Sequence, residues 1–210
     1  MTRKVYLIFI TICISLTLSS CFDVVEEINM KNNGSGSIVG TLNMSKSRTK
    51  VSSLMKLDKI DGFKIPNQTE IRNQVTTLVQ LLKNTKGISN VNYFQNIDAL
   101  NSYTATLAKH FKSNLNNYSN YSYDLNKKTF VRSYKHNPNA KKEFDKLKPE
   151  NQKSFDQAFY TSIYRFQNPI IKQGNVLGKV SGNKQAVMIK VPIATLINGN
   201  ANLANTILLN

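Results

Sequence analysis

The sequence predicts an α+β fold, a mainly antiparallel β-sheet with an N-terminal hairpin and two or three packed helices. Short runs that alternate apolar and polar residues recur along the chain, and such runs are typical of half-buried strands. Clusters rich in Asn, Gly and Ser separate these runs and are typical of turns. One stretch, residues 68–83, instead has the spacing of an amphipathic helix.

The hairpin is predicted over residues 22–45. Apolar residues such as Ile28 alternate with polar ones, and the alternation resumes at Ile38 after a turn that contains Asn33 and Gly34. Asn-Gly is a strong hairpin signal, because both positions tolerate the positive φ angles of a type I′ turn. One face of the hairpin is therefore expected to be apolar.

The helix is predicted to begin near Gln68, with Asn67 or Thr69 as its cap. Its apolar residues fall at spacings of three, four and seven: Ile71, Val75, Leu78, Val79 and Leu82. Lysines and then Gly87 are typical of its C-terminal end. This spacing predicts one buried stripe that faces the core.

Most of the remaining chain is predicted to be strand. The predicted strands are 88–94, 102–111, 127–134, 155–166, 176–180, 186–191 and 206–209. Residues 99–115 also satisfy helical spacing, although the strand is favoured. A helix with a break at Pro149 is predicted over residues 140–153.

Residues 114–123 are expected to form a loop or a short helix that carries Tyr118, Tyr121 and Tyr123. Two interpretations of these tyrosines are open. They form a stacking surface for a carbohydrate or a lipid head group, or they cover an edge of the core with their hydroxyls in water, which is the favoured interpretation.

The first twenty-one residues have the layout of a secretory signal. Residues 1–4 include two basic side chains, residues 5–18 are apolar, and Ser19 and Ser20 precede Cys21. The fourteen residues of the apolar region are fewer than the roughly 20 that a membrane-spanning helix needs. A plain N-terminal membrane helix is therefore disfavoured.

This segment resembles the signal of bacterial lipoproteins, whose lipobox is an aliphatic residue, two small residues and a cysteine. Residues 18–21 match all four positions. The resemblance implies that residues 1–20 are removed, that Cys21 takes a diacylglycerol thioether, and that its new α-amino group is acylated. Residues 21–210 are then expected to form a single lipid-anchored domain in the cell envelope, with the outer membrane as the leading expectation and the face left open.

A wider resemblance rests on structural motifs. An acylated Cys21 that leads directly into a strand, the hairpin at 34–36, the run 165–169 with Asn175 after it, and the turn at 181–184 resemble a group of uncharacterised lipoproteins of the Bacteroidota. More loosely, the layout is similar to the mycobacterial LppM-like lipoproteins, whose domain has been linked to lipid binding. No catalytic residue is implied by either resemblance.

The charge and the cysteines limit the possible chemistry. Loss of Arg3 and Lys4 with the signal lowers the formal net charge from +16 to +14, which favours anionic lipid or another acidic partner, unless a lysine-rich composition alone explains it. Cys13 lies in the signal and Cys21 is expected to be lipidated. No cysteine then remains for a disulfide, a metal or a nucleophile, so packing alone is expected to hold the domain together.

Catalytic motifs are not found. His110 and His136 lack a second ligand at metal-binding spacing, and the chain has no nucleophile elbow and no phosphate-binding glycine loop. The acidic pairs at 26–27 and 143–145 are expected to be ordinary solvated surface pairs. The sequence therefore predicts no catalytic residue, no cofactor, no metal and no nucleic-acid partner.

The expected function is non-enzymatic binding at the membrane surface, with a lipid, an envelope glycan or a partner protein as the ligand. The alternative is a hydrolase-like envelope enzyme whose residues assemble only in three dimensions.

Overall fold

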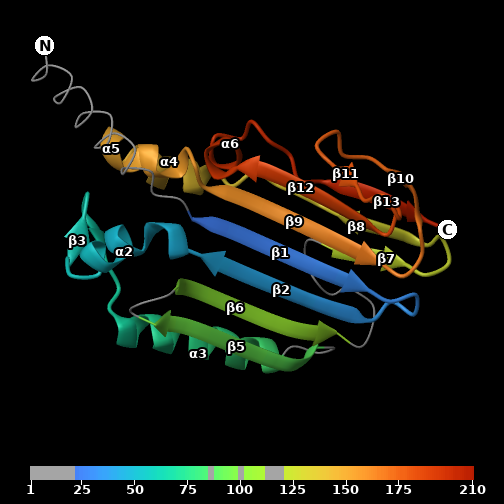
Figure 1. Ribbon diagram of the computed structural model, residues 1–210, viewed down its shortest axis with the longest axis horizontal. Helices are drawn as coiled ribbons and strands as arrows, with labels where there is room; N and C mark the ends of the chain where they lie inside the picture. The colour runs from blue at the N-terminus through green and yellow to red at the C-terminus, as the bar shows by residue number, and fades with distance from the viewer. Residues whose placement is uncertain (1–21, 85–87, 99–101, 112–120) are drawn as a thin grey trace, which may run out of the picture.

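The computed structural model describes residues 22–84, 88–98, 102–111 and 121–210 (Figure 1). Cys21 and the predicted signal before it lie outside these residues. The predicted α+β fold is confirmed: the strands form a large sheet, a smaller sheet and a two-stranded hairpin, and short helices lie around them. All the strand pairs described are antiparallel except one.

The larger sheet has the strand order β11-β12-β9-β1-β2-β6-β5. Its strands are β1 (Asp23–Met30), β2 (Gly36–Asn43), β5 (Ile88–Asp98), β6 (Ser102–Phe111), β9 (Phe159–Phe166), β11 (Lys179–Val180) and β12 (Ala186–Pro192). The parallel pair is β1 with β9, which joins the first strand of the chain to a strand in its C-terminal half.

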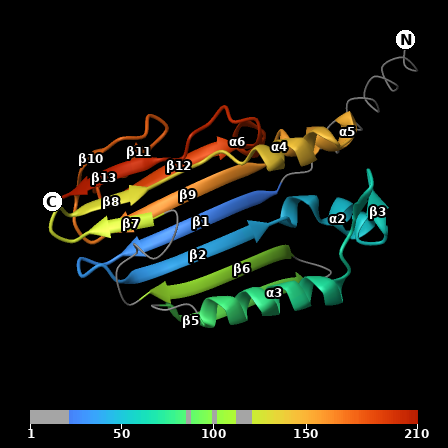
Figure 2. The ribbon, with the colours of Figure 1, turned by 180° about the vertical axis from the view of Figure 1, so that it is seen from behind.

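The smaller sheet has the order β10-β13-β8-β7. Its strands are β7 (Tyr121–Asp124), β8 (Thr129–Arg132), β10 (Ile170–Gln173) and β13 (Asn205–Leu209). It lies on one face of the larger sheet (Figure 2). The main core fills the space between the two sheets: Ile28, Met30, Ile38, Tyr123, Phe130, Tyr164, Phe166, Ile170, Val187, Ile207 and Leu209.

The helices and the small hairpin occupy the ends and edges of the sheets. They are η1 (Ser45–Ser47), α2 (Arg48–Leu54), β3 (Lys59–Ile60), β4 (Phe63–Lys64), α3 (Gln68–Lys83), α4 (Pro138–Asp145), α5 (Pro149–Gln152), η3 (Lys153–Phe155) and α6 (Ile193–Ile197). Among the described residues, none of these helices is long and apolar enough to cross a bilayer.

The predicted helix is confirmed as α3, and Asn67 is its cap. The Asn67 side chain accepts a hydrogen bond from the Glu70 backbone N–H, and the Glu70 carboxylate accepts one from the Asn67 N–H, which is a complete capping box. The helix packs on β5, on the same side of the sheet as the smaller sheet (Figure 2). The predicted buried stripe is only half-buried where it is described, because one edge strand covers the helix.

The N-terminal hairpin is confirmed, but its turn is not of type I′. The Lys31 N–H donates to the Ser35 carbonyl, and the Gly34 N–H donates to the Lys31 carbonyl. Only Gly34 has a positive φ, of 78°, whereas Asn33 uses its side chain to accept hydrogen bonds from Ser35. These contacts make a three-residue loop with a bulge at Gly34, which is the next most common hairpin connection.

Other predictions are confirmed or corrected. Residues 102–111 are strand rather than helix, and Pro149 begins a new helix as the predicted break. A loop or short helix was expected over 114–123, and this prediction is wrong for residues 121–123, which belong to β7. Tyr118 lies outside the described residues. Strand β10 and helix α6 were not predicted.

Candidate functional site

Two rows of mostly polar residues face each other between the sheets. On the larger sheet, the register places three residues from β9, β1 and β2 side by side: Ser162, Glu26 and Gly40. On the smaller sheet, it places three residues from β13, β8 and β7 side by side: Asn205, Arg132 and Tyr121. We call the polar side chains in and beside these rows the polar cluster: Glu26, Tyr121, Arg132, Tyr160, Ser162, Tyr164 and Asn205.

Arg132 is the centre of the polar cluster. Its side chain is only 7% exposed, and its Nη2 donates a hydrogen bond of 2.9 Å to the Tyr160 hydroxyl. The same nitrogen lies 3.6 Å from the Glu26 Oε1, which makes an ion pair between the two sheets. The guanidinium carbon is 5.5 Å from the centre of the Tyr160 ring and 5.7 Å from that of Tyr121. Arg132 is therefore fixed by one charge and two aromatic rings.

The polar cluster contains many buried atoms without a hydrogen-bond partner among the described residues. They are the Arg132 Nε and Nη1, the Glu26 Oε1, the Tyr121 and Tyr164 hydroxyls, the Ser162 Oγ and the Asn205 Nδ2. Members of the cluster still interact weakly with one another, because beside the effect of burial Ser162 and Arg132 lower the pKa of Tyr164 by hydrogen bonding, and Glu26 raises that of Tyr160. Each unsatisfied buried donor or acceptor costs roughly 1–3 kcal/mol, and buried polar groups in proteins are normally paired. This concentration of open hydrogen-bonding capacity is the feature of the interior that best fits a ligand site.

The polar cluster is accessible from the side of β2. The Glu26 side chain is 23% exposed, although it lies between the sheets. Gly40 is its direct partner on β2, and a Cβ placed on Gly40 has no heavy atom of the described residues within 4 Å. Val24 and Leu42, the next pair toward the start of β1, are half-buried. The described residues therefore leave room beside the carboxylate on the inner face of the sheet.

The three tyrosines of the polar cluster stay protonated at neutral pH. Burial raises the pKa of Tyr121 and Tyr160 above its ordinary value, and the negative charge of Glu26 adds to this shift while Arg132 opposes it. Burial likewise raises the pKa of Tyr164 to about 12, against the opposing effect of Arg132. Each hydroxyl can therefore both donate and accept a hydrogen bond.

The chemistry of the polar cluster suits binding by hydrogen bonds. The charges of Glu26 and Arg132 cancel, so the cluster as described has no net charge. It contains one carboxylate and neither histidine nor cysteine. Across the described part of the chain, no group of three or more His, Cys, Asp or Glu side chains is placed to hold a metal ion.

The structure corrects the expectation for Glu26. It was expected to form a solvated surface pair with Glu27, but alternation along β1 turns Glu26 inward to Arg132. Glu27 points the other way and pairs with Arg165 at 3.4 Å. A sequence signal existed, because Glu26 shares its face with Ile28, and Arg132 shares its face with Phe130.

The second acidic pair lies at the surface, as expected. Lys141 contacts Asp145 at 2.7 Å, and Lys146 contacts Glu143 at 2.7 Å. Both contacts lie on or just after α4, and both are exposed.

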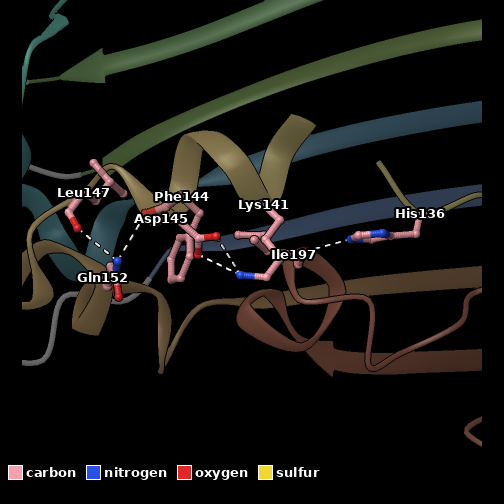
Figure 3. A network of polar contacts seen from close by, with 7 residues as sticks. All are labelled: His136, Lys141, Phe144, Asp145, Leu147, Gln152 and Ile197. Carbon is pink, nitrogen blue, oxygen red and sulfur yellow. Dashed lines mark hydrogen bonds and ion pairs between the residues drawn. The ribbon is translucent and has the colours of Figure 1, made fainter. Parts of the chain in front are cut away.

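The histidines do not join the polar cluster where they are described. The His136 Nε2 lies 2.8 Å from the Ile197 carbonyl oxygen and links the chain before α4 to α6 (Figure 3). In the same region the Gln152 side chain donates to the carbonyls of Phe144 and Leu147. His136 therefore has a structural contact, and the His110 side chain lies outside what the structure describes.

The predicted lipidation site, Cys21, lies just before the described chain. Phe22, its neighbour, packs edge to face on Phe155 with ring centres 5.4 Å apart, and its carbonyl accepts a hydrogen bond from the Phe159 N–H. Lipidation of Cys21 itself stays a prediction.

No family model and no curated protein matches the chain. The NMR structure of the folded domain of LppM from Mycobacterium tuberculosis is similar, with a TM-score of 0.42 and 10% sequence identity over 91% of each chain.

Proposed function

We propose that this chain is a lipoprotein of the cell envelope, anchored through Cys21, and that it is a non-enzymatic binding protein for an amphiphile. The polar end of the amphiphile is held at the polar cluster. The observation that carries this proposal is the set of unpartnered buried atoms around Arg132, which adjoins open space at Gly40.

The position of the polar cluster relative to Cys21 supports an amphiphilic ligand. Strand β1 begins at Asp23, directly after the docked Phe22, so the anchor has almost no tether. Glu26 lies three residues further along, which is about 10 Å at the rise of a strand. A lipid-anchored protein would hold the polar cluster close to the bilayer surface, where amphiphiles are concentrated.

The composition of the polar cluster supports binding rather than hydrolysis. Hydrolases usually pair a nucleophile or an activated water with a positioned base, often a histidine or a second carboxylate. The cluster, as far as it is described, has one carboxylate that is already paired with Arg132.

The test of the ligand site is solvent extraction of the purified full-length protein followed by mass spectrometry. We expect a stoichiometric amphiphile from the wild type and its loss from the double variant Glu26→Leu/Arg132→Met, which removes both charges together. A wild type without bound amphiphile, or a double variant with the same amount, would contradict the proposal.

The test of the anchor is Cys21→Ser in the full chain. The variant is expected to lose incorporation of labelled palmitate and to leave the membrane fraction or remain uncleaved. Unchanged acyl labelling would overturn the lipoprotein assignment without affecting the ligand site.

A further inference from the structure

Gly40 occupies a position in β2 that no backbone requirement explains. Its φ is not positive, unlike those of Gly34, Gly62 and Gly199. Glycine inside a strand weakens the strand, because it has no side chain to pack and loses more conformational entropy on folding. A common reason for such a glycine is the close approach of a ligand or of another backbone. At Gly40 no heavy atom in the described part of the chain approaches the Cβ position within 4 Å.

We infer that Gly40 is the entrance through which the ligand reaches the polar cluster, and that the ligand's head group is uncharged and bears hydroxyl groups. This inference rests on the proposed function and names the substrate class of the same site. Directly opposed residues of antiparallel strands have Cβ atoms about 4.5–5.5 Å apart. Any larger side chain at position 40 would therefore stand beside the Glu26 carboxylate and fill the open space.

The hydrogen-bonding groups of the polar cluster determine the head group. The Arg132 Nε and Nη1 require an acceptor, whereas the Glu26 Oε1 requires a donor. A hydroxyl group satisfies both requirements, and a diol can satisfy them at the same time. An anionic head group would lie beside Glu26, and a cationic one beside Arg132, in an interior where an uncompensated charge is costly.

The surroundings of Gly40 place the apolar part of the ligand. Toward the middle of the core, the neighbouring pair is Ile28 with Ile38, and both are buried. Toward the start of β1, the neighbouring pair is Val24 with Leu42, and both are only half-buried. The acyl chain therefore extends along Val24 and Leu42, toward the end of the sheet at which β1 begins.

The experiment is native mass spectrometry of the full-length protein in a zwitterionic detergent. Three probes of equal chain length are added separately: monoolein, oleic acid and dioleoyl phosphatidate. Each is tested on the wild type, on Gly40→Leu, and on Val39→Leu, a matched control that adds bulk to the outer face of the same strand.

The wild type and Val39→Leu are expected to bind monoolein, and Gly40→Leu is expected to bind it at least tenfold more weakly with an unchanged or higher melting temperature. If Gly40→Leu binds monoolein as tightly as the wild type does, the inference that the ligand enters past Gly40 is wrong. Binding of oleic acid or phosphatidate in preference to monoolein would overturn the uncharged head group and leave the proposed function standing. Failure of the wild type to bind any of the three probes would overturn both.

Discussion

Asp61 and Lys148 are 87 residues apart in the chain and are joined by a hydrogen bond of 2.9 Å from the Lys148 backbone N–H to the Asp61 Oδ2. The same oxygen accepts a bond of 2.7 Å from the Asn151 side chain. The Asp61 side chain is 5% exposed and sits in the β3–β4 turn at a φ of 48°. This carboxylate therefore attaches the small hairpin to the beginning of α5.

Stability near Asp61 is expected to depend on pH. The hydrogen bonds from Lys148 and Asn151 lower the pKa of Asp61 below its ordinary value. A carboxyl with a lowered folded-state pKa adds stability above its unfolded pKa of about 3.9, and this stability is lost as the pH falls through the folded-state pKa. Asp61→Asn should therefore lower the melting temperature at neutral pH and have little effect near pH 2.

Circular dichroism melts at the two pH values measure this effect. Asn tolerates the positive φ at this position, so backbone strain is not added. Asp58→Asn, at an exposed carboxylate in the same segment, is the control. An equal fall in melting temperature at both pH values would show that the charge of Asp61 is not what stabilises the contact.

The ion pair between Glu26 and Arg132 predicts a non-additive pair of variants. Arg132→Met should destabilise the protein by about 3 kcal/mol, because it leaves the Glu26 carboxylate between the sheets without its partner. Glu26→Leu in the same chain should recover most of this loss. Urea unfolding of the two single variants and the double variant measures the coupling. If the two single variants lose unfolding free energy additively in the double variant, the ion pair between Glu26 and Arg132 is contradicted.

The buried tyrosines predict loss of stability in alkali. Burial raises the pKa of Tyr164 to about 12, and it raises those of Tyr121 and Tyr160 as well. A group with a raised folded-state pKa adds stability that is present below its unfolded pKa of about 10 and is lost as the pH rises through the folded value. Stability should therefore fall above about pH 10, and less steeply in Tyr164→Phe. Urea unfolding between neutral and alkaline pH checks this, with Tyr134→Phe as the control.

Gly34 is expected to be intolerant of a side chain because of its backbone. Gly34→Val places its Cβ at ordinary contact distances from Leu125 and Tyr123, so the cost comes from the φ of 78°. That strain is about 1–2 kcal/mol, which lowers the melting temperature by several degrees. Gly182→Val is the matched control, because its φ is not positive and no atom lies within 4 Å of its Cβ position. Equal melting temperatures of Gly34→Val and Gly182→Val would argue against the bulged turn.

Much of the fold was predictable because its signals are local. Alternation along β1, β2 and β8 correctly predicts which residues share a face, and Pro149 correctly marks the start of a new helix. Strand β10 was missed because its sequence does not alternate, and β7 was missed because it directly follows an Asn- and Ser-rich stretch that is typical of a loop. The sequence favours a strand that includes Phe155, but this residue ends the short helix η3, where its ring packs between Phe22 and Phe144.

The candidate site was predictable only in part. Alternation puts Arg132 on the face of Phe130, and it puts Glu26 on the face of Ile28, so two charged residues at core positions were visible in the sequence. Their meeting was not visible, because Glu26 and Arg132 belong to different sheets and no local pattern specifies which strands face each other.

The sequence by itself determined the features that depend on a few neighbouring residues. The Asn67 cap of α3 and the left-handed position of Gly34 follow from short-range hydrogen bonds and backbone sterics. Only the tertiary structure decided that β1 pairs in parallel with β9 and that the row of Arg132 lies over the row of Glu26. The physical reason is that strand pairing and sheet packing are selected by the burial of the whole apolar surface, so one strand's partner depends on every other strand.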